Sequence, residues 1–165
     1  MKVLGIDTGT TQAGLVLYDS ETNVVLEKEI LENHKSITWV RELAKSGVVD
    51  IAGIEMMACM GMVVGQTTFE ACAWIGHYER VLWDLGKETR KVYRGKVKLH
   101  HCGSPKASDP NISRALKDRF PETGGGKDPS KGIKSKPGPL YGMRDHMWSA
   151  LAIAMYTFDT YSPGL

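Results

Sequence analysis

The sequence predicts an α/β fold in which helices cover a mixed sheet of five strands. Short apolar segments separated by turn residues occupy the first part of the chain, as in a run of β-strands. Farther along, segments with apolar residues at helical spacing alternate with strand-like segments. We expect the 165 residues to form one domain, because a chain of this length can bury a core of its own.

The first part of the chain predicts three strands, a helix and a fourth strand. The first two strands flank the turn sequence TGTTQ, and the third begins apolar and then alternates, as an edge strand does. Ser36 as a cap and Gly47 as a terminator predict the helix. These elements are expected over residues 2–7, 13–18, 23–31, 36–47 and 48–55.

The second part predicts three helices and one more strand region. Alternation over 89–101 indicates a strand or a strand pair, and Asp109 with Pro110 indicates the start of a helix. Residues 121–139 are rich in glycine, proline and lysine without any periodicity, which predicts a flexible loop. The helices are expected over 66–86, 109–120 and 144–161.

The predicted element order is three strands, a helix, a strand, a helix, a strand and two helices. Three antiparallel strands followed by crossovers through helices give a mixed five-stranded sheet. This is the strand order of the ribonuclease H-like architecture.

Three acids lie at the ends of predicted buried elements. Asp7 ends the first strand, Glu55 ends the fourth, and Asp145 opens the last helix. The first and fourth strands are neighbours in the predicted order, so Asp7 and Glu55 are expected to meet. Each acid also has a structural interpretation: Asp7 builds the turn, Glu55 pairs with a lysine, and Asp145 caps its helix.

Carboxylates that converge at the rim of an apolar sheet repel each other unless a cation neutralises them. Hard oxygen ligands suit Mg²⁺, with Mn²⁺ as a substitute. Two such ions about 3.5–4 Å apart can activate water and stabilise the leaving oxygen in phosphodiester hydrolysis. The acids therefore predict a two-ion site.

Three segments resemble the RuvC-type Holliday junction resolvases, particularly the small phage-type members: GIDTGTTQAGLVLYD, GIEMM, and DHMWSALAIAMY in the closing helix. The resemblance implies a ribonuclease H-like fold over residues 1–165 and a homodimeric, Mg²⁺-dependent endonuclease. The implied substrates are four-way junctions and other branched DNA such as flaps and Y-junctions. It also assigns Asp7 and Glu55 as metal ligands.

The closing helix departs from the pattern of that family. Its members usually carry two acids, or a histidine and an acid, three residues apart, and alignment places His146 and Ser149 at these positions. Asp145 lies four residues before Ser149 and so shares its helical face. We expect Asp145 to be a ligand and His146 to be a metal-site residue or proton donor. Because of Ser149, an inactive protein that binds branched DNA is an alternative.

The opening segment also resembles the first phosphate motif of the sugar kinase, Hsp70 and actin (ASKHA) superfamily. There a Gly/Thr turn binds ATP phosphates through backbone N–H groups. Those enzymes close two such domains over the nucleotide in a much longer chain, and the sequence GGGKD (124–128) lacks a preceding strand. A kinase or ATPase is therefore the weaker alternative.

Basic residues concentrate in the second half of the chain. Residues 1–85 carry a net charge of −6 and residues 86–165 a net charge of +8, which favours contact with a polyanion if these residues gather on one surface. The resemblance places a lysine near the cleaved strand, for which Lys98 and Lys106 are candidates. The 121–139 loop either orders over DNA or is a surface excursion. The expected DNA-binding residues are Arg90, Lys91, Arg94, Lys96, Lys98 and Lys106.

Four methionines follow Glu55 in the sequence MMACMGM. They are flexible core residues or, at Met57 and Met60, an apolar wedge that probes a junction. Trp74, Tyr78 and Trp83 on the next helix belong to the core or to a dimer interface.

The N-terminus lacks the features of a signal peptide, and no segment has the roughly 20 apolar residues of a membrane span. A cytoplasmic location without membrane contact is the resulting expectation. The three cysteines are odd in number and widely spaced, which argues against a disulfide framework. A zinc site at His100, His101 and Cys102 is a minor alternative.

Overall fold

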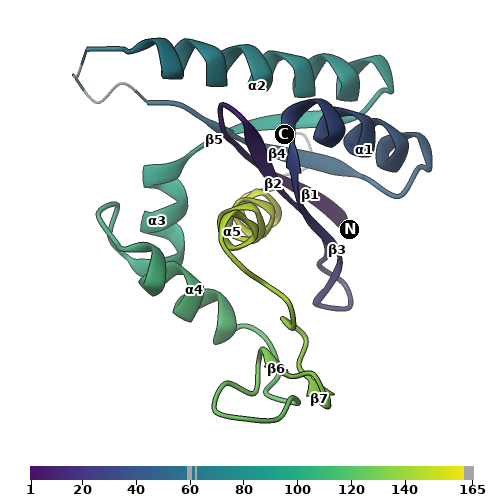
Figure 1. Cartoon of the computed structure of the whole chain (residues 1–165), viewed down its shortest axis with the longest axis vertical. Helices are drawn as coiled ribbons and strands as arrows, with labels where there is room; N and C mark the ends of the chain where they lie inside the picture. The colour runs from purple at the N-terminus through teal and green to yellow at the C-terminus, as the bar shows by residue number, and fades with distance from the viewer. Residues whose placement is uncertain (59–60, 62, 162–165) are drawn as a thin grey trace.

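Five strands form one mixed sheet with the order β3-β2-β1-β4-β5 in a computed structural model that describes residues 1–58, 61 and 63–161 (Figure 1). β1–β2 and β2–β3 pair antiparallel, whereas β1–β4 and β4–β5 pair parallel. This confirms the predicted sheet, with β3 at one edge and β1 beside β4. The strands are β1 Lys2–Thr8, β2 Gln12–Asp19, β3 Val24–Glu32, β4 Ile51–Met56 and β5 Glu88–Tyr93.

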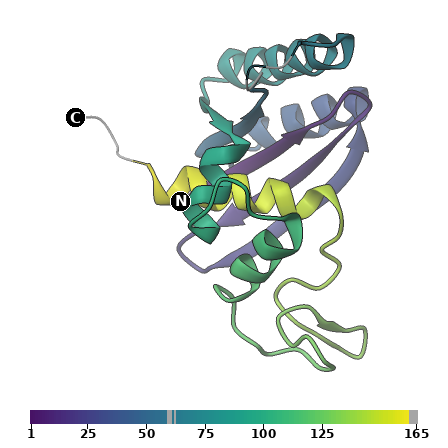
Figure 2. The same ribbon diagram turned by 90° about the vertical axis from the view of Figure 1, so that its left-hand side faces the viewer.

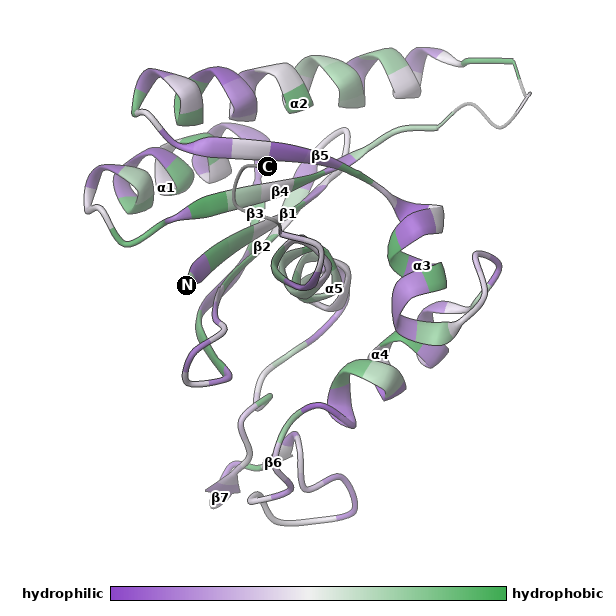
Figure 3. Ribbon diagram, turned by 180° about the vertical axis from the view of Figure 1, so that it is seen from behind, coloured by the Kyte–Doolittle hydropathy of each residue, from purple (hydrophilic) through white to green (hydrophobic). Residues whose placement is uncertain are grey.

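Helices cover both faces of the sheet. α1 (Asn33–Lys45) and α2 (Gln66–Asp84) lie on one face, and α5 (His146–Asp159) crosses the other (Figures 1 and 2). α3 (Arg94–Cys102) and α4 (Asp109–Lys117) pack beside α5. In Figure 3 the surface helices α1 and α2 carry both hydrophilic and hydrophobic stripes, as expected where one side of a helix meets the sheet.

Strand alternation divides the core into two layers. Leu4, Ile6 and Ile54 point into the layer beneath α1 and α2. The residues between them, including Gly5 and Gly53, face α5. Asp7 and Glu55 follow these glycines at a spacing of two, so both acids lie on the α5 side of the sheet.

Glycines allow α5 to approach the strands closely. A Cβ atom added at Gly5 would overlap the carbonyl oxygen of Ala150, and one at Gly14 would overlap the backbone of His146. Gly5 is paired with Gly53 across β1 and β4, and Gly14 is paired with Asp7 across β1 and β2. The start of α5 is therefore held directly against the strands that carry the acids.

The prediction of strand structure through residue 101 is wrong. β5 ends at Tyr93, and the following nine residues form α3, which ends at Gly103 in the left-handed region (φ 71°). The helix forms because Val97 is buried beside α5. Gly103 follows a last turn that contains two histidines, which is a signal for the end of a helix. In the sequence this signal is masked by the alternating pattern of the preceding residues.

Two further predictions need correction. α1 begins at Asn33, not at Ser36, because Ser36 lies buried inside the helix, where its hydroxyl donates to the Asn33 carbonyl oxygen (2.7 Å) and lies 2.5 Å from the hydroxyl of Tyr78. The 121–139 segment is not without regular structure, since it contains a small hairpin of β6 (Gly132–Ile133) and β7 (Lys136–Pro137).

The hairpin segment is attached to α4. Asp128 accepts hydrogen bonds from Lys117 (2.5 Å) and from the hydroxyl of buried Ser130 (3.0 Å). The backbone N–H of Leu140 donates to the Ser130 carbonyl oxygen (2.8 Å). Among the residues that the structure describes, no helix is both long and apolar enough to cross a membrane.

Candidate active site

A recess of about 640 Å³ opens where the ends of β1 and β4 meet the N-terminal ends of α3, α4 and α5. Its lining includes acids from three of these elements and basic residues from α3. Several helix N-termini pointing at one place make that place electrostatically suited to anions. The recess thus combines buried acids with an anion-attracting rim.

Asp7 and Glu55 lie together in this recess, as the sequence predicts. The parallel pairing of Ile6 with Ile54 puts the two acids side by side at the ends of their strands. Their exposed fractions are 6% for Asp7 and 9% for Glu55. Two carboxyl groups at this burial are costly to keep ionised without a compensating charge.

The environment changes the acidity of both groups. Burial, followed by the hydrogen bond and the negative charge of Asp7, raises the pKa of Glu55 to about 8. Burial also raises the pKa of Asp7, although the hydrogen bond with Glu55 and the charge of Arg94 act in the opposite direction. A pair of this kind shares protons until a cation enters, which makes it suited to holding one.

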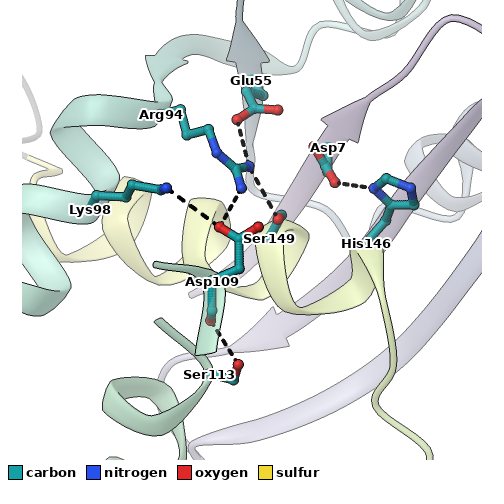
Figure 4. A network of polar contacts seen from close by, with 8 residues as sticks. All are labelled: Asp7, Glu55, Arg94, Lys98, Asp109, Ser113, His146 and Ser149. Atoms are coloured by element: carbon teal, nitrogen blue, oxygen red, sulfur yellow. Dashed lines mark hydrogen bonds and ion pairs between the residues drawn. The ribbon is translucent and has the colours of Figure 1, made fainter. Parts of the chain in front are cut away.

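His146 joins the site from the first residue of α5. Its Nδ1 atom lies 2.9 Å from Oδ2 of Asp7, and its side chain is half-exposed (Figure 4). The contact depends on Gly14, which lets the backbone of His146 lie directly on β2. The sequence-based expectation that His146 belongs to the site agrees with this position.

Arg94 lines the recess from the first residue of α3, and it does not belong to a row of basic residues along a strand. Its Nη1 atom is 3.4 Å from Oε1 of Glu55 and 3.4 Å from Oγ of Ser149, and its Nη2 atom is 2.5 Å from Oδ1 of Asp109 (Figure 4). Burial acts to lower the pKa of Arg94, but the surrounding carboxylates raise it overall. The guanidinium therefore binds the acids of the site.

Asp109 is a site residue that the sequence analysis missed. The Asp-Pro pair suggests a helix cap, yet the residue at the cap of α4 is Ser108. Asp109 instead lies one position into the helix and faces Arg94 and Lys98, whose Nζ is 3.5 Å from Oδ1 of Asp109. An acid just before a proline carries no sequence signal for such a long-range contact.

Asp145 and Ser149 occupy different positions in the recess. Asp145 lines it, but its side chain is 69% exposed and its Oδ2 atom lies 3.5 Å from Nη1 of Arg144. Ser149 lies one turn farther along and accepts from Arg94. Asp145 would have to leave Arg144 to join Asp7 and Glu55, so its role as a ligand stays a prediction.

The possible metal ligands in the recess are few, but they are of the type that binds a hard divalent cation. Carboxylate oxygens from Asp7 and Glu55 are the ligand type that Mg²⁺ and Mn²⁺ prefer, and the imidazole of His146 is also a metal ligand. Within the described part of the chain, no group of three or more His, Cys, Asp or Glu side chains is already arranged around one point for a metal. The carboxylates of Asp7 and Glu55 are therefore the two groups that would hold the cation.

The other predicted DNA-binding residues are dispersed. Lys98 lines the recess because it lies four residues, about one helical turn, after Arg94. Lys106 lies in the loop after α3, beside a separate shallow pocket, and is not part of the recess. Lys96 is exposed on α3, and Lys91 pairs with Glu79 (3.2 Å).

Arg90 is also engaged within the chain, because its Nη1 donates to the Thr160 carbonyl oxygen (3.3 Å) and its guanidinium stacks over Tyr161. The six basic residues therefore do not form one continuous stripe on a strand. The reason is the change from β5 to α3 at Arg94, which sends the later side chains in helical directions.

The methionine and aromatic residues also separate. Met57 is partly buried against the core under α2, while Met60 lies outside the described residues. Tyr78 is a fully buried core residue, and burial raises its pKa to about 12. Trp83 is 56% exposed, with its Nε1 donating to Thr89 (2.8 Å).

His100 and His101 lie on α3 and bind other parts of the protein. Nε2 of His100 is 2.7 Å from Asp159, and Nε2 of His101 is 2.9 Å from the carbonyl oxygen of Ala152. These contacts attach α3 to α5, and they give the two histidines a structural role in place of the zinc alternative.

The glycine-threonine turn is used within the fold. The N–H of Gly9 donates to the carbonyl oxygen of Gln12 (3.1 Å), and the side chain of Asn33 donates to the carbonyl oxygen of Gly9 (3.1 Å). The Asn33 backbone N–H donates to the Thr11 carbonyl oxygen (3.0 Å). A turn held in this way supports a tight hairpin behind Asp7 better than a phosphate-binding loop.

No family model matches the sequence, and no curated protein sequence matches it. Solved structures do match in three dimensions. The structure of Thermus thermophilus RuvC aligns with a TM-score of 0.70 at 16% identity, over 96% of this chain and 93% of that one. The same protein in complex with a Holliday junction substrate aligns with a TM-score of 0.70 at 17% identity and the same coverage. The chain therefore has the ribonuclease H-like fold of the RuvC-type Holliday junction resolvases.

Proposed function

We propose that this protein is a metal-dependent endonuclease that cuts branched DNA, with Holliday junctions as the principal substrate. The observation that carries the proposal is the pair Asp7 and Glu55, buried side by side in a recess of a resolvase fold. A solved neighbour with the same fold was determined with a Holliday junction, which supports this class of substrate.

The side chains suggest a division of roles. Asp7 and Glu55 would hold Mg²⁺ or Mn²⁺, with His146 and Asp145 as further predicted ligands. When bound, such an ion lowers the pKa of a coordinated water and stabilises charge on the phosphate. The imidazole of His146, bonded to Asp7, is placed to hold or transfer a proton at the edge of the recess.

Basic residues near the recess would bind the DNA backbone. Lys98 lies inside the recess and is the better candidate for the scissile phosphate, whereas Lys106 is farther out and suits a flanking phosphate. The exposed Lys96 extends the same helix outward, and the 121–139 hairpin carries four further lysines. Contacts of this kind supply affinity without sequence preference.

A homodimer completes the proposal. Two copies related by a two-fold axis would present two active sites to opposite strands of a four-way junction. The exposed Phe69 (66%) and Trp83 (56%) on α2 support an interface on that helix. Sedimentation of the protein at several concentrations tests this, and a monomer at all of them would contradict it.

The central experiment compares DNA substrates and metals. Labelled four-way, Y-shaped, flap and linear DNA are incubated with the protein in Mg²⁺, Mn²⁺ or EDTA. We expect metal-dependent cleavage of branched DNA, loss of cleavage in Asp7→Asn, and unchanged cleavage in Glu42→Gln, an exposed acid on α1 that pairs with Lys45. Absence of metal-dependent cleavage on every branched substrate would refute the nuclease proposal.

A second candidate function follows from Arg94 and Ser149. A guanidinium bonded to Glu55 and a serine on α5 could leave a protein that binds branched DNA without cutting it. Tight junction binding without cleavage in the same experiment would favour this candidate. ATP hydrolysis that disappears in Asp7→Asn would instead revive the kinase-like alternative.

A further inference from the structure

Arg94 occupies the side of the recess that Ser149 and Asp109 line, next to the pair of Asp7 and Glu55. Asp7 contacts His146, whereas Glu55, Ser149 and Asp109 contact the guanidinium (Figure 4). Arg94 therefore places a positive charge of the protein itself among the acids of the recess.

The guanidinium competes with a metal ion for the same oxygens. Its Nη1 atom approaches Oε1 of Glu55 and Oγ of Ser149 at 3.4 Å each. A divalent ion on that side would need these oxygens at about 2.0–2.6 Å and would repel the adjacent cation. The hydroxyl of Ser149 adds no negative charge to offset that repulsion.

The two other acids that line the recess, Asp109 and Asp145, are also engaged, and Oδ2 of Asp145 lies 3.5 Å from Nη1 of Arg144. Asp109 binds Arg94 and lies 3.5 Å from Nζ of Lys98, so two cations already balance its charge. Asp7 and Glu55 are the buried carboxylates in the recess among the described residues. Two carboxylates and a histidine supply ligands for one divalent ion, whereas a pair of ions needs more negative charge.

We propose that Arg94 takes the place of a second metal ion, so that the active site binds one divalent cation between Asp7 and Glu55. This inference rests on the proposed function, and it replaces the two ions expected from the sequence with one. Arg94 supplies the second positive charge from the protein itself, at the side of the recess lined by Ser149.

The chemistry of arginine suits this role better than that of lysine. The planar guanidinium donates in several directions at once, and it binds carboxylate and phosphate oxygens with defined geometry. Arg94 uses this fork to contact Glu55, Ser149 and Asp109 together. Since Arg94 is 43% exposed, part of it also faces solvent, where a DNA phosphate would arrive.

The test counts bound ions directly. Binding of Mn²⁺ is titrated and free Mn²⁺ is measured by electron paramagnetic resonance, for the protein alone and with a four-way junction after subtraction of the Mn²⁺ held by DNA. We expect one ion per chain for the wild type and two for the double variant Arg94→Ser/Ser149→Asp. The control Arg114→Ser removes an arginine of α4 that lines the other pocket, and it should keep one ion.

Single variants protect the test against misfolding of the double variant. Ser149→Asp alone should still bind one ion, because Arg94 would pair with the new carboxylate. Circular dichroism of each variant confirms that the fold is retained. In Arg94→Lys the charge remains but the fork is lost, so the ion count should stay at one while cleavage slows by about 10–100-fold.

Two ions per wild-type chain would overturn the inference, as would an unchanged count of one in a folded double variant. The outcome is separable from that of the proposed function. One bound ion without cleavage of branched DNA would refute the nuclease and leave the ion count standing. Absence of any Mn²⁺ binding would overturn both.

Discussion

The Nδ1 atom of His146 lies 2.9 Å from Oδ2 of Asp7, which joins the first turn of the last helix to the first strand. The two residues are 139 positions apart in the sequence. Their contact orients a half-exposed imidazole beside a buried carboxyl group. Chemistry at the recess should therefore depend on His146 even where DNA binding does not.

Replacement of His146 by alanine should slow junction cleavage by about 100-fold, the usual order for loss of a general acid or base. The affinity for the junction should change by less than about threefold, because the imidazole is directed to Asp7 and the basic residues of the recess are Arg94 and Lys98. Single-turnover cleavage and equilibrium binding measure the two effects. His146→Asn keeps an N–H near the position of Nδ1, so it should retain the contact with Asp7 but not the proton transfer. Equal cleavage by wild type and His146→Ala would exclude a chemical role for this residue.

The stability of the metal-free protein should fall as the pH rises from 5 to 8. The pKa of Glu55 is about 8 in the folded state, against an ordinary value of 4.5. Because the folded state holds this proton more tightly, the resulting stabilisation is complete below pH 4.5 and is lost as the pH passes through 8. The loss should be on the order of a few kcal/mol, since one pKa unit corresponds to about 1.4 kcal/mol.

Urea unfolding in EDTA at several pH values measures this slope. Glu55→Gln should remove most of it, whereas Glu70→Gln, an exposed position on α2, should leave it unchanged. Added Mg²⁺ should restore stability at pH 8 in the wild type but much less in Glu55→Gln. A slope that is the same in Glu55→Gln and wild type would show that another group dominates.

Gly14→Ala should damage the site through the backbone. The new Cβ atom would overlap the carbonyl group and Cβ of His146, so the start of α5 would have to move away from β2. We expect a loss of about 1–3 kcal/mol in the free energy of unfolding, together with weaker Mn²⁺ binding. Gly76→Ala on α2, where an added Cβ meets nothing within 4 Å, is the matched control and should be neutral or slightly stabilising. Normal Mn²⁺ affinity in Gly14→Ala would contradict this link.

Asp128→Ala should loosen the hairpin segment without affecting the sheet. The change removes the contacts with Lys117 and Ser130, worth about 1 kcal/mol together. Limited trypsin digestion followed by mass spectrometry should show roughly fivefold faster cleavage after Lys127, Lys131 and Lys134. Lys136 precedes Pro137 and is a poor site. Asp118→Ala changes an exposed acid nearby, and this variant should be digested at the rate of the wild type. Equal digestion rates for the wild type and both variants would mean that Asp128 does not hold the segment in place.

The sheet and its two central acids were predictable because they depend on local pattern and simple topology. Alternation and turn residues identify the strands, and the crossover through α1 makes β1 and β4 parallel neighbours. Asp7 and Glu55 then meet at the same edge. The meeting of these two acids can thus be predicted without knowledge of any tertiary contact.

The contacts of Arg94 with Glu55, Ser149 and Asp109 were not predictable in the same way. The sequence RGKVKLHH has apolar residues that satisfy strand alternation, and burial of Val97 against the α5 layer settles the helix. Only the helix directs Arg94 and Lys98 to one face and into the recess. The partners of Arg94 come from three separate elements, which local pattern does not reveal.

The glycine contacts under α5 hold the backbone around the recess in place. Because a Cβ atom at Gly5 or Gly14 would overlap backbone atoms of α5, no side chain separates the helix from the strands there, and the helix has little freedom to slide or roll. The backbone at positions 146 and 149 is therefore held beside Asp7 and Glu55 by these contacts. A substitution at position 149 can therefore change the charge of the recess while the backbone around it stays where it is.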